Sequence, residues 1–237
     1  LAAGYYLKTA LGSRTVAVEP IECPTMLYNG YGEHNIQGIG DKHIPLIQNI
    51  MNTDIIVGVS DESCDHLNVL INTDAGREYL TGRRGLDSKS VEALSVLGLS
   101  GIANVLAAIK TARLLDLGAD DAVITVATDS GALYVSERER TEKTDFHDGF
   151  DQVSAGKVYA RHMLGQGEEH ILEMTHRERR RVFNLGYYTW VEQQGVSLED
   201  FEKRSDQRFW EGLQNILPVW DAMIEEFNGH TGVNRPD

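Results

Sequence analysis

The chain has 237 residues, enough for one large domain or for one domain with a substantial extension, and its formal net charge is −14 at pH 7. This acidity argues against a nucleic-acid-binding protein, which needs a basic surface for the phosphates, and against binding to an anionic membrane surface. No apolar run approaches the roughly 20 residues of a transmembrane helix, so we expect no membrane-spanning segment.

Cysteine usage and the opening residues bear on the compartment. Cys23 and Cys64 show no CxxC or CxxxC spacing, so we expect two buried thiols in a reducing compartment and predict no metal ligands. The opening stretch also lacks the basic region of a signal peptide. These features predict a cytoplasmic protein.

The first half of the chain alternates helical and strand patterns. A helix expected at residues 2–11 is followed by a β-branched run at residues 15–18, and two similar runs occupy residues 54–59 and 121–127. Their unbroken apolar character is typical of parallel strands covered on both faces. The order of these elements predicts an α/β fold with a parallel sheet.

An amphipathic helix is predicted between the last two runs. Ser100 is its expected N-cap and Gly118 its expected C′ residue. Its apolar stripe, with i, i+3, i+4 and i+7 spacing, consists of Ile102, Val105, Leu106, Ile109, Ala112 and Leu115.

From about residue 137 charged residues become dense, and helical patterns follow around residues 158–164, 176–194 and 198–227. The last pattern has an apolar face formed by Leu213, Ile216, Leu217, Trp220 and Ile224. A basic cluster comprises Arg177, Arg179, Arg180 and Arg181. We expect it to be a solvated face or to pair with nearby Glu, with an anion or subunit contact as the alternative.

Residues 29–45, NGYGEHNIQGIGDKHIP, form a glycine-rich segment without helical or strand periodicity. Glycine permits a positive φ and lets the backbone approach a flat ligand closely, and long glycine loops in compact domains are often functional. The alternative is an ordinary surface loop. The segment is no phosphate-binding P-loop, because the Walker spacing and its Lys are absent.

A second informative segment is VATDSGALY, residues 126–134, at the carboxyl end of the predicted strand 121–127. Ligands of open parallel sheets bind outside the carboxyl ends of the strands, which makes Asp129, Ser130 and Gly131 candidates for ligand contact. Asp-Ser-Gly is also common turn chemistry, so a plain turn stays open. Neighbouring strand residues point to opposite faces, so Asp129 and Ser130 cannot both face one ligand while the strand is regular.

Five motifs in order resemble the fold type II pyridoxal-phosphate enzymes, in particular the cysteine synthase and cystathionine β-synthase group. They are the helix and strand ending in VEP, the segment IQGIG, the strand leading into VGVSD, the turn and helix GLSGIANVLAAIK, and ATDSGALY. The resemblance covers residues 1–136 and implies the later part of a tryptophan synthase β-like core. Residues 137–237 match no part of that core and are expected to form a mainly helical extension.

The resemblance implies a cofactor, pyridoxal 5′-phosphate, and residues that would contact it. Ser130 would present a neutral hydroxyl to the pyridine nitrogen, and the glycine bend Gly38, Ile39 and Gly40 would lie beside the ring. A neutral hydroxyl does not hold a proton on that nitrogen, which suits β-elimination or β-replacement. Asp41 departs from the small or apolar residue expected at its position, and His43 is a candidate contact for the substrate carboxylate, with an ordinary surface histidine as the alternative.

The family's Schiff-base lysine and its phosphate loop precede the helix with which this sequence opens, and none of Lys8, Lys42, Lys89 or Lys110 lies in the required motif. We therefore expect this chain to act on a small amino acid together with an N-terminal half or companion chain that carries the lysine, as a homo- or hetero-oligomer. One alternative is a non-catalytic α/β interaction subunit. Another is an ordinary α/β small-molecule-binding domain that matches the motifs by chance.

Overall fold

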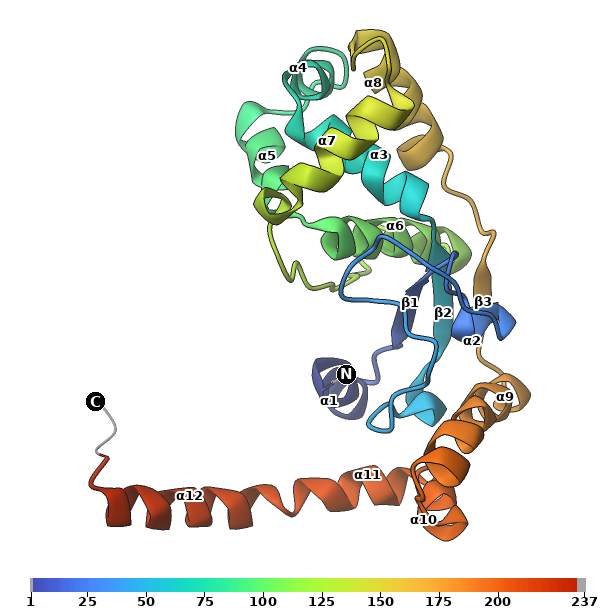
Figure 1. The fold of residues 1–237 in the computed structure, drawn as a ribbon, viewed down its shortest axis with the longest axis vertical. Coiled ribbons are helices and arrows are strands. Elements are labelled where there is room, and N and C mark those ends of the chain that lie inside the picture. The colour runs from blue at the N-terminus through green and yellow to red at the C-terminus, as the bar shows by residue number, and fades with distance from the viewer. Residues whose placement is uncertain (1, 234–237) are drawn as a thin grey trace. The chain divides into compact units, whose positions relative to one another are not determined.

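A computed structural model of the chain describes residues 2–233, which group into two compact units interleaved along the sequence (Figure 1). Unit 1 contains residues 2–15, 43–53 and 175–233, and unit 2 contains residues 16–42 and 54–174. The predicted domains, residues 1–136 and 137–237, are instead two continuous stretches of the chain. This division stays a prediction.

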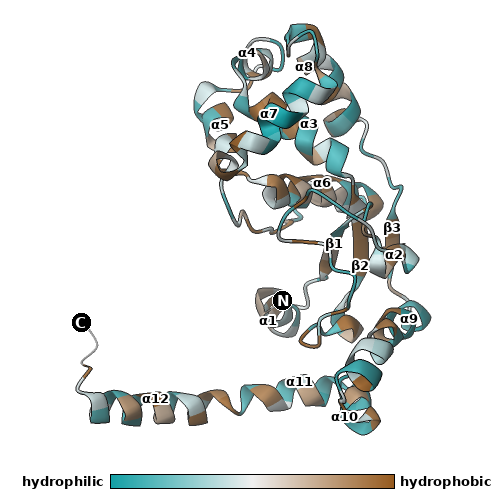
Figure 2. Cartoon of the chain, viewed as in Figure 1, coloured by the Kyte–Doolittle hydropathy of each residue, from teal (hydrophilic) through white to brown (hydrophobic). Residues whose placement is uncertain are grey.

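Unit 2 is built on a mixed sheet whose strand order, within the described residues, is β1–β2–β3. β1 (Val16–Pro20) and β2 (Ile55–Val59) are parallel, whereas β3 (Ile171–Glu173) runs antiparallel to β2. Every residue of β2 is buried, which explains its unbroken apolar sequence, and Figure 2 shows this strand as hydrophobic. The α/β class and the first two predicted strands, including their parallel pairing, are confirmed.

The third predicted strand is wrong. Residues 121–127 lie outside the sheet and have no regular structure, and the side chains of Val123, Ile124 and Val126 are exposed. A β-branched run becomes a strand only beside a partner strand. The strand that pairs with β2 on the side away from β1 is β3, a three-residue strand too short to stand out in the sequence.

Helices cover this sheet and pack on one another in unit 2. They are α2 (Thr25–Tyr28), α3 (Asp61–Asn72), α4 (Asp74–Gly82), α5 (Ser88–Ala93), α6 (Leu99–Leu114), α7 (Val135–Asp145) and α8 (Gln152–Tyr159), with a π-helical turn, η4 (Ala160–Leu164), directly after α8. α6 packs on β1 and β2, and α3 lies among α4, α6, α7 and α8 (Figure 1). The buried side chains of α3, α6 and β2 form the main hydrophobic core.

A helix at the predicted place is confirmed as α6, but both of its expected caps are wrong. The N-cap is Gly98, and Ser100 lies buried in the first turn, where its hydroxyl is 2.8 Å from that of Thr128. The C-cap is Leu115, and Gly118 lies beyond the helix. The Ser100 hydroxyl therefore joins α6 to the segment that contains Thr128 and does not cap the helix.

The predicted apolar stripe of α6 is only partly its buried face. Ile102 and Leu106 are buried, and the other four members of the stripe are partly buried. The buried face also carries Lys110 and Thr111.

Unit 1 consists of α1 (Ala2–Leu11), the 3-10 turn η1 (Ile50–Asn52) and the C-terminal helices. These are α9 (His176–Tyr187), a π-helical turn η5 (Tyr188–Gln193), α10 (Leu198–Lys203), α11 (Gln207–Gln214) and α12 (Leu217–Thr231). Lys8 Nζ donates to Asn52 O at 2.8 Å, and Trp190 Nε1 donates to Ile44 O at 2.7 Å. The helix at residues 2–11 and the helical character of the C-terminal patterns are confirmed.

Two arginines of the basic cluster on α9 form the ion pairs with Glu that the sequence predicts. Arg180 pairs with Glu202 of α10 at 3.2 Å and Arg181 with Glu178 at 2.6 Å. Arg179 Nε donates to Thr53 O at 2.8 Å. Arg179 and Arg180 therefore join α9 to other parts of unit 1.

Apolar side chains are exposed along α11 and α12. The exposed large ones are Leu213, Leu217, Val219, Trp220, Met223, Ile224 and Phe227. Within residues 2–233, no single helix is long and apolar enough to cross a bilayer; α5 to η2 (Leu94–Val96) and α6 meet the criterion only together, across a bend of 116°.

Buried carboxylates fix the backbone between β1 and α3. Glu19, at the end of β1, is 3% exposed, and its two oxygens accept from the N–H groups of Met26 and Leu27 at 3.0 and 2.8 Å. These amides belong to the first turn of α2, which leaves them without intrahelical partners. Glu19 therefore determines where the chain turns after the sheet.

Replacing Glu19 with Gln should lower the free energy of unfolding by about 2 kcal/mol, because one of the two N–H groups would face an NH₂ group instead of an acceptor. Urea denaturation measures the change. Glu33→Gln is the matched control, because Glu33 is exposed, and it should change stability by less than about 0.5 kcal/mol. Equal stability of the two variants would contradict this role of Glu19.

Candidate functional site

The glycine segment is ordered because side chains bind its backbone on both sides. The Asp61 carboxylate at the start of α3 accepts from Asn35 N at 2.5 Å and from Ile36 N at 3.2 Å. Glu22 in turn accepts from Asp61 N, with both oxygens at 3.1 Å. The VGVSD motif therefore holds the beginning of the IQGIG segment, and Ser60 caps α3 by accepting from Ser63 N at 3.2 Å.

The loop closes at its other end through Thr25 and His34. The Thr25 hydroxyl donates to Asp41 O at 2.6 Å, and His34 Nε2 is 3.2 Å from Gly40 O. Ile36 is fully buried, whereas Gly38 is exposed. The bend thus projects from an anchored base.

Gly38 and Gly40 both have a positive φ, of 88° and 82°. A Cβ at Gly38 would meet no atom within 4 Å, whereas a Cβ at Gly40 would lie 2.7 Å from Pro20 and from His34. Ile39 between them packs its partly buried side chain on the core. The backbone at Gly38 is therefore open to a ligand, and Gly40 is required by close packing.

The two predicted substrate residues belong to different units. Asp41 is an exposed residue of unit 2. His43 is an exposed residue of unit 1, and its Nδ1 lies 3.2 Å from the Thr189 hydroxyl.

Ser130 lies in a turn before η3 (Gly131–Tyr134), not at the end of a strand. Its hydroxyl accepts from Ala132 N at 3.2 Å and lies 3.4 Å from Ser95 O. The neighbouring Asp129 side chain points elsewhere, because it accepts a hydrogen bond from the Tyr134 phenol. Ser130 therefore lies in a turn, and the side chains of Asp129 and Ser130 have different hydrogen-bond partners. The parity argument does not apply, because these residues do not lie in a strand.

The structure brings only part of the predicted site together. Gly38, Ile39, Gly40 and Asp41 lie in one anchored loop. Within the described residues, the hydrogen bonds of the Ser130 hydroxyl go to Ser95 and Ala132, and none reaches that loop. A cofactor between the loop and Ser130 stays a prediction.

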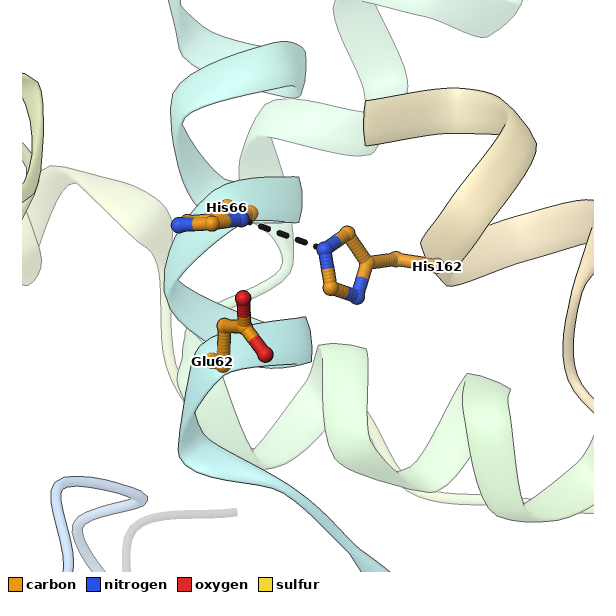
Figure 3. A group of neighbouring side chains, drawn as sticks. All are labelled: Glu62, His66 and His162. Carbon is orange, nitrogen blue, oxygen red and sulfur yellow. Dashed lines mark hydrogen bonds between the residues drawn. The ribbon is translucent and has the colours of Figure 1, made fainter. Parts of the chain in front are cut away.

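A group that the sequence analysis missed lies between α3 and η4. Glu62 and His66 lie one turn apart on α3, and His162 approaches them from η4 (Figure 3). His66 Nδ1 is 3.1 Å from His162 Nε2, and one ligand atom from each of the three side chains lies within 4.8 Å of the others. The i, i+4 spacing of Glu62 and His66 was readable in the sequence, whereas His162 is distant along the chain.

Both histidines have a hydrogen-bond partner at their second ring nitrogen. His66 Nε2 lies 2.9 Å from Asp145 Oδ2, and His162 Nδ1 lies 2.9 Å from the Ser63 hydroxyl. Burial lowers the pKa of His162 to about 4, and the neighbouring His66 and Arg161 add to this effect. The hydrogen bond from His66 lowers the pKa of Asp145.

Lys110 is a buried lysine on α6. It is 2% exposed, and its Nζ lies 3.7 Å from Glu169 Oε1. Burial lowers the pKa of Lys110, although Glu169 opposes the shift. Its ammonium thus completes an ion pair at the edge of the core of unit 2.

Neither protein-family models nor curated proteins give a match to this chain. The geometry and chemistry of its own residues therefore carry the functional argument.

Tyr134→Phe should destabilise the protein by about 1.5 kcal/mol at pH 8, because the variant loses a hydrogen bond to a carboxylate. Burial, assisted by Asp129, raises the pKa of Tyr134 to about 12, above the value of about 10 in the unfolded chain. The phenol's contribution is therefore complete below pH 10 and is lost as the pH rises from 10 to 12.

Urea denaturation of both proteins across this pH range should show their difference in stability shrinking above pH 10. Tyr31→Phe is the control, since Tyr31 is 76% exposed, and it should follow the original protein at every pH. A difference that stays constant up to pH 12 would contradict the assignment.

Proposed function

We propose that this chain is part of a pyridoxal-phosphate-dependent lyase or transferase that performs β-elimination or β-replacement on a small amino acid. The Schiff-base lysine and the phosphate loop belong to a companion polypeptide or an N-terminal half. The observation that carries the proposal is the anchored glycine bend at residues 38–40, whose backbone is open to a flat ligand at Gly38.

The bend fits one wall of such a cofactor site. At Gly38 a φ of 88° and empty surroundings leave the backbone accessible to an aromatic ring, and any side chain there would be strained. Asp61 and Glu22 hold the base of the bend, so little ordering is needed when a ligand arrives.

Ser130 fits the role of a neutral partner for the ring nitrogen. Its hydroxyl proton is bound only at 3.4 Å by Ser95 O, the outer limit of a hydrogen bond, so it is available to another acceptor. The Tyr134 phenol donates a hydrogen bond to the Asp129 carboxylate. Without this bond the carboxylate would compete with the Ser130 hydroxyl for the ring nitrogen of the cofactor. The bound cofactor supplies an electron sink, and a hydroxyl at Ser130 keeps that sink weaker than a carboxylate would.

Residues 121–127 fit the surface on which the companion polypeptide adds a strand. Within residues 2–233, no backbone N–H of residues 122–128 donates a hydrogen bond in the chain. The side chains of Val123, Ile124 and Val126 are 44%, 75% and 60% exposed. Free N–H groups beside β-branched side chains are what a partner strand satisfies and covers.

The cofactor experiment uses the complex captured from its native source through this chain. The complex should absorb as a Schiff base, and borohydride reduction should fix the cofactor to a lysine outside these 237 residues. Ser130→Ala should shift the absorption and Ser130→Thr should restore it, because both Ser and Thr carry the hydroxyl.

Ser136→Ala is the matched control, because Ser136 is exposed on α7, and its spectrum should be unchanged. Absence of a Schiff-base band, or reduction onto any lysine of this chain, would refute the proposal.

Ile124→Asp should abolish capture of the lysine-bearing polypeptide, because a carboxylate would be buried at the added strand without a partner. Val153→Asp is the control, since Val153 is also exposed, at 62%, and lies on α8 away from this segment. Quantitative mass spectrometry of the captured complex measures the effect. Equal recovery with the two variants would show that residues 121–127 do not bind the companion.

A second candidate function, a cofactor-free interaction subunit, is favoured by the exposed apolar side chains of α11 and α12. Val219→Asp separates the two functions, because Val219 lies on α12. A complex that has no Schiff-base band and depends on Val219 but not on Ile124 would support the interaction subunit.

A further inference from the structure

We propose that Glu62, His66 and His162 bind one divalent transition-metal ion, with Zn²⁺ as the probe of choice. Two imidazoles and a carboxylate are a ligand set typical of zinc sites that keep a fourth position for water or a substrate. This inference does not depend on the proposed cofactor.

The two imidazole nitrogens are placed as ligands of one ion would be. Tetrahedral bonds of about 2.05 Å from zinc to nitrogen put two ligand nitrogens about 3.3 Å apart. His66 Nδ1 and His162 Nε2 are 3.1 Å apart, with ring planes at 85° to each other. The distance between the two nitrogens therefore has to grow by only a few tenths of an ångström, while the rings turn so that both lone pairs point at the ion.

The outer hydrogen bonds orient both rings for this purpose. His66 Nε2–H donates to Asp145, which leaves Nδ1 as the nitrogen that carries the lone pair. A carboxylate bound to the far nitrogen of a histidine is the usual support of a metal ligand. His66 is therefore in the required tautomer before the ion arrives.

His162 reaches its ligand state by exchanging tautomers. Without an ion, a chain of donors runs from Ser60 through Ser63 to His162 Nδ1, and His162 Nε2–H then donates to His66. With an ion, the imidazole proton resides on Nδ1 and is donated to Ser63, because a hydroxyl both donates and accepts. The imidazole stays neutral, because the proton that leaves Nε2 is replaced by one on Nδ1.

Glu62 supplies the third ligand from a more mobile position. Its carboxylate pairs with Arg161 at 2.9 Å, and both side chains are well exposed, so the pair is weak. Glu62 points toward the gap between the two rings from one helical turn before His66 (Figure 3). Arg161 competes with the ion for Glu62 and repels it, so Arg161→Gln should raise the affinity.

The bound ion joins two elements that are distant in the sequence. α3 contributes two ligands and η4 the third, so the ion crosslinks the centre of unit 2 to the turn that follows α8. Because the unfolded chain lacks this arrangement, binding should raise the midpoint of thermal unfolding by several degrees at saturating Zn²⁺.

The test titrates the full chain, stripped by a chelator, with Zn²⁺ against a chromophoric competitor, and with Co²⁺ to read the coordination geometry. We expect one equivalent of Zn²⁺ to bind at micromolar or lower concentration. His66→Gln and His162→Gln should weaken binding by more than about 100-fold, and Asp145→Asn, which only removes orientation, by about 10- to 100-fold.

Glu62→Gln keeps the test valid if a histidine variant misfolds, because Glu62 is exposed and its replacement should not disturb folding. Circular dichroism verifies the fold of the Glu62→Gln variant. His230→Gln is the matched control, since His230 forms an exposed i, i+4 pair with Glu226 at 3.6 Å, and it should bind like the original chain. Absence of binding up to about 100 µM Zn²⁺, or equal affinity in the folded Glu62→Gln variant, would overturn the proposal.

Discussion

Carboxylates that bind backbone amides hold the segment between the first two strands, and the candidate cofactor wall depends on them. Glu19 fixes the turn after β1, Glu22 binds the start of α3, and Asp61 binds the backbone just before the glycine bend. Each carboxylate meets N–H groups that no helix or strand satisfies. A loop rich in glycine would otherwise have many conformations to lose. The acidic residues at the ends of β1 and β2 therefore have a local structural purpose.

The sequence predicted elements whose signal is local and strong. β2 is an unbroken apolar run with full burial, and the helical pattern of α6 is long, so pattern alone predicted both elements. The pattern did not predict which face of α6 is buried, because that face includes Lys110 and Thr111. Residues 121–127 have the same β-branched character yet form no strand, because strand formation depends on a neighbour that the pattern does not reveal. Ser100 failed as a cap for a similar reason, since its hydroxyl meets Thr128.

The candidate residues differ in how they could be recognised. Gly38, Ile39 and Gly40 are contiguous, so a short motif finds them, and their resemblance to a known family gives them a role to test. His162 lies far along the chain from His66, and only folding brings them within 3.1 Å. No residue spacing predicts that encounter. The sequence did not predict the roles of Ser63 and Asp145 either, because each of them binds a histidine that belongs to another helix.

The π-helical turn at Ala160–Leu164 has a consequence for the histidine pair. The wider coil of this turn ends α8 and sets the direction in which the His162 side chain leaves the helix. Each helical residue advances the side-chain direction by about 100°, so one codon more or less decides whether an imidazole here faces α3 or solvent. One residue gained or lost just before His162 would therefore turn its imidazole away from His66 on α3.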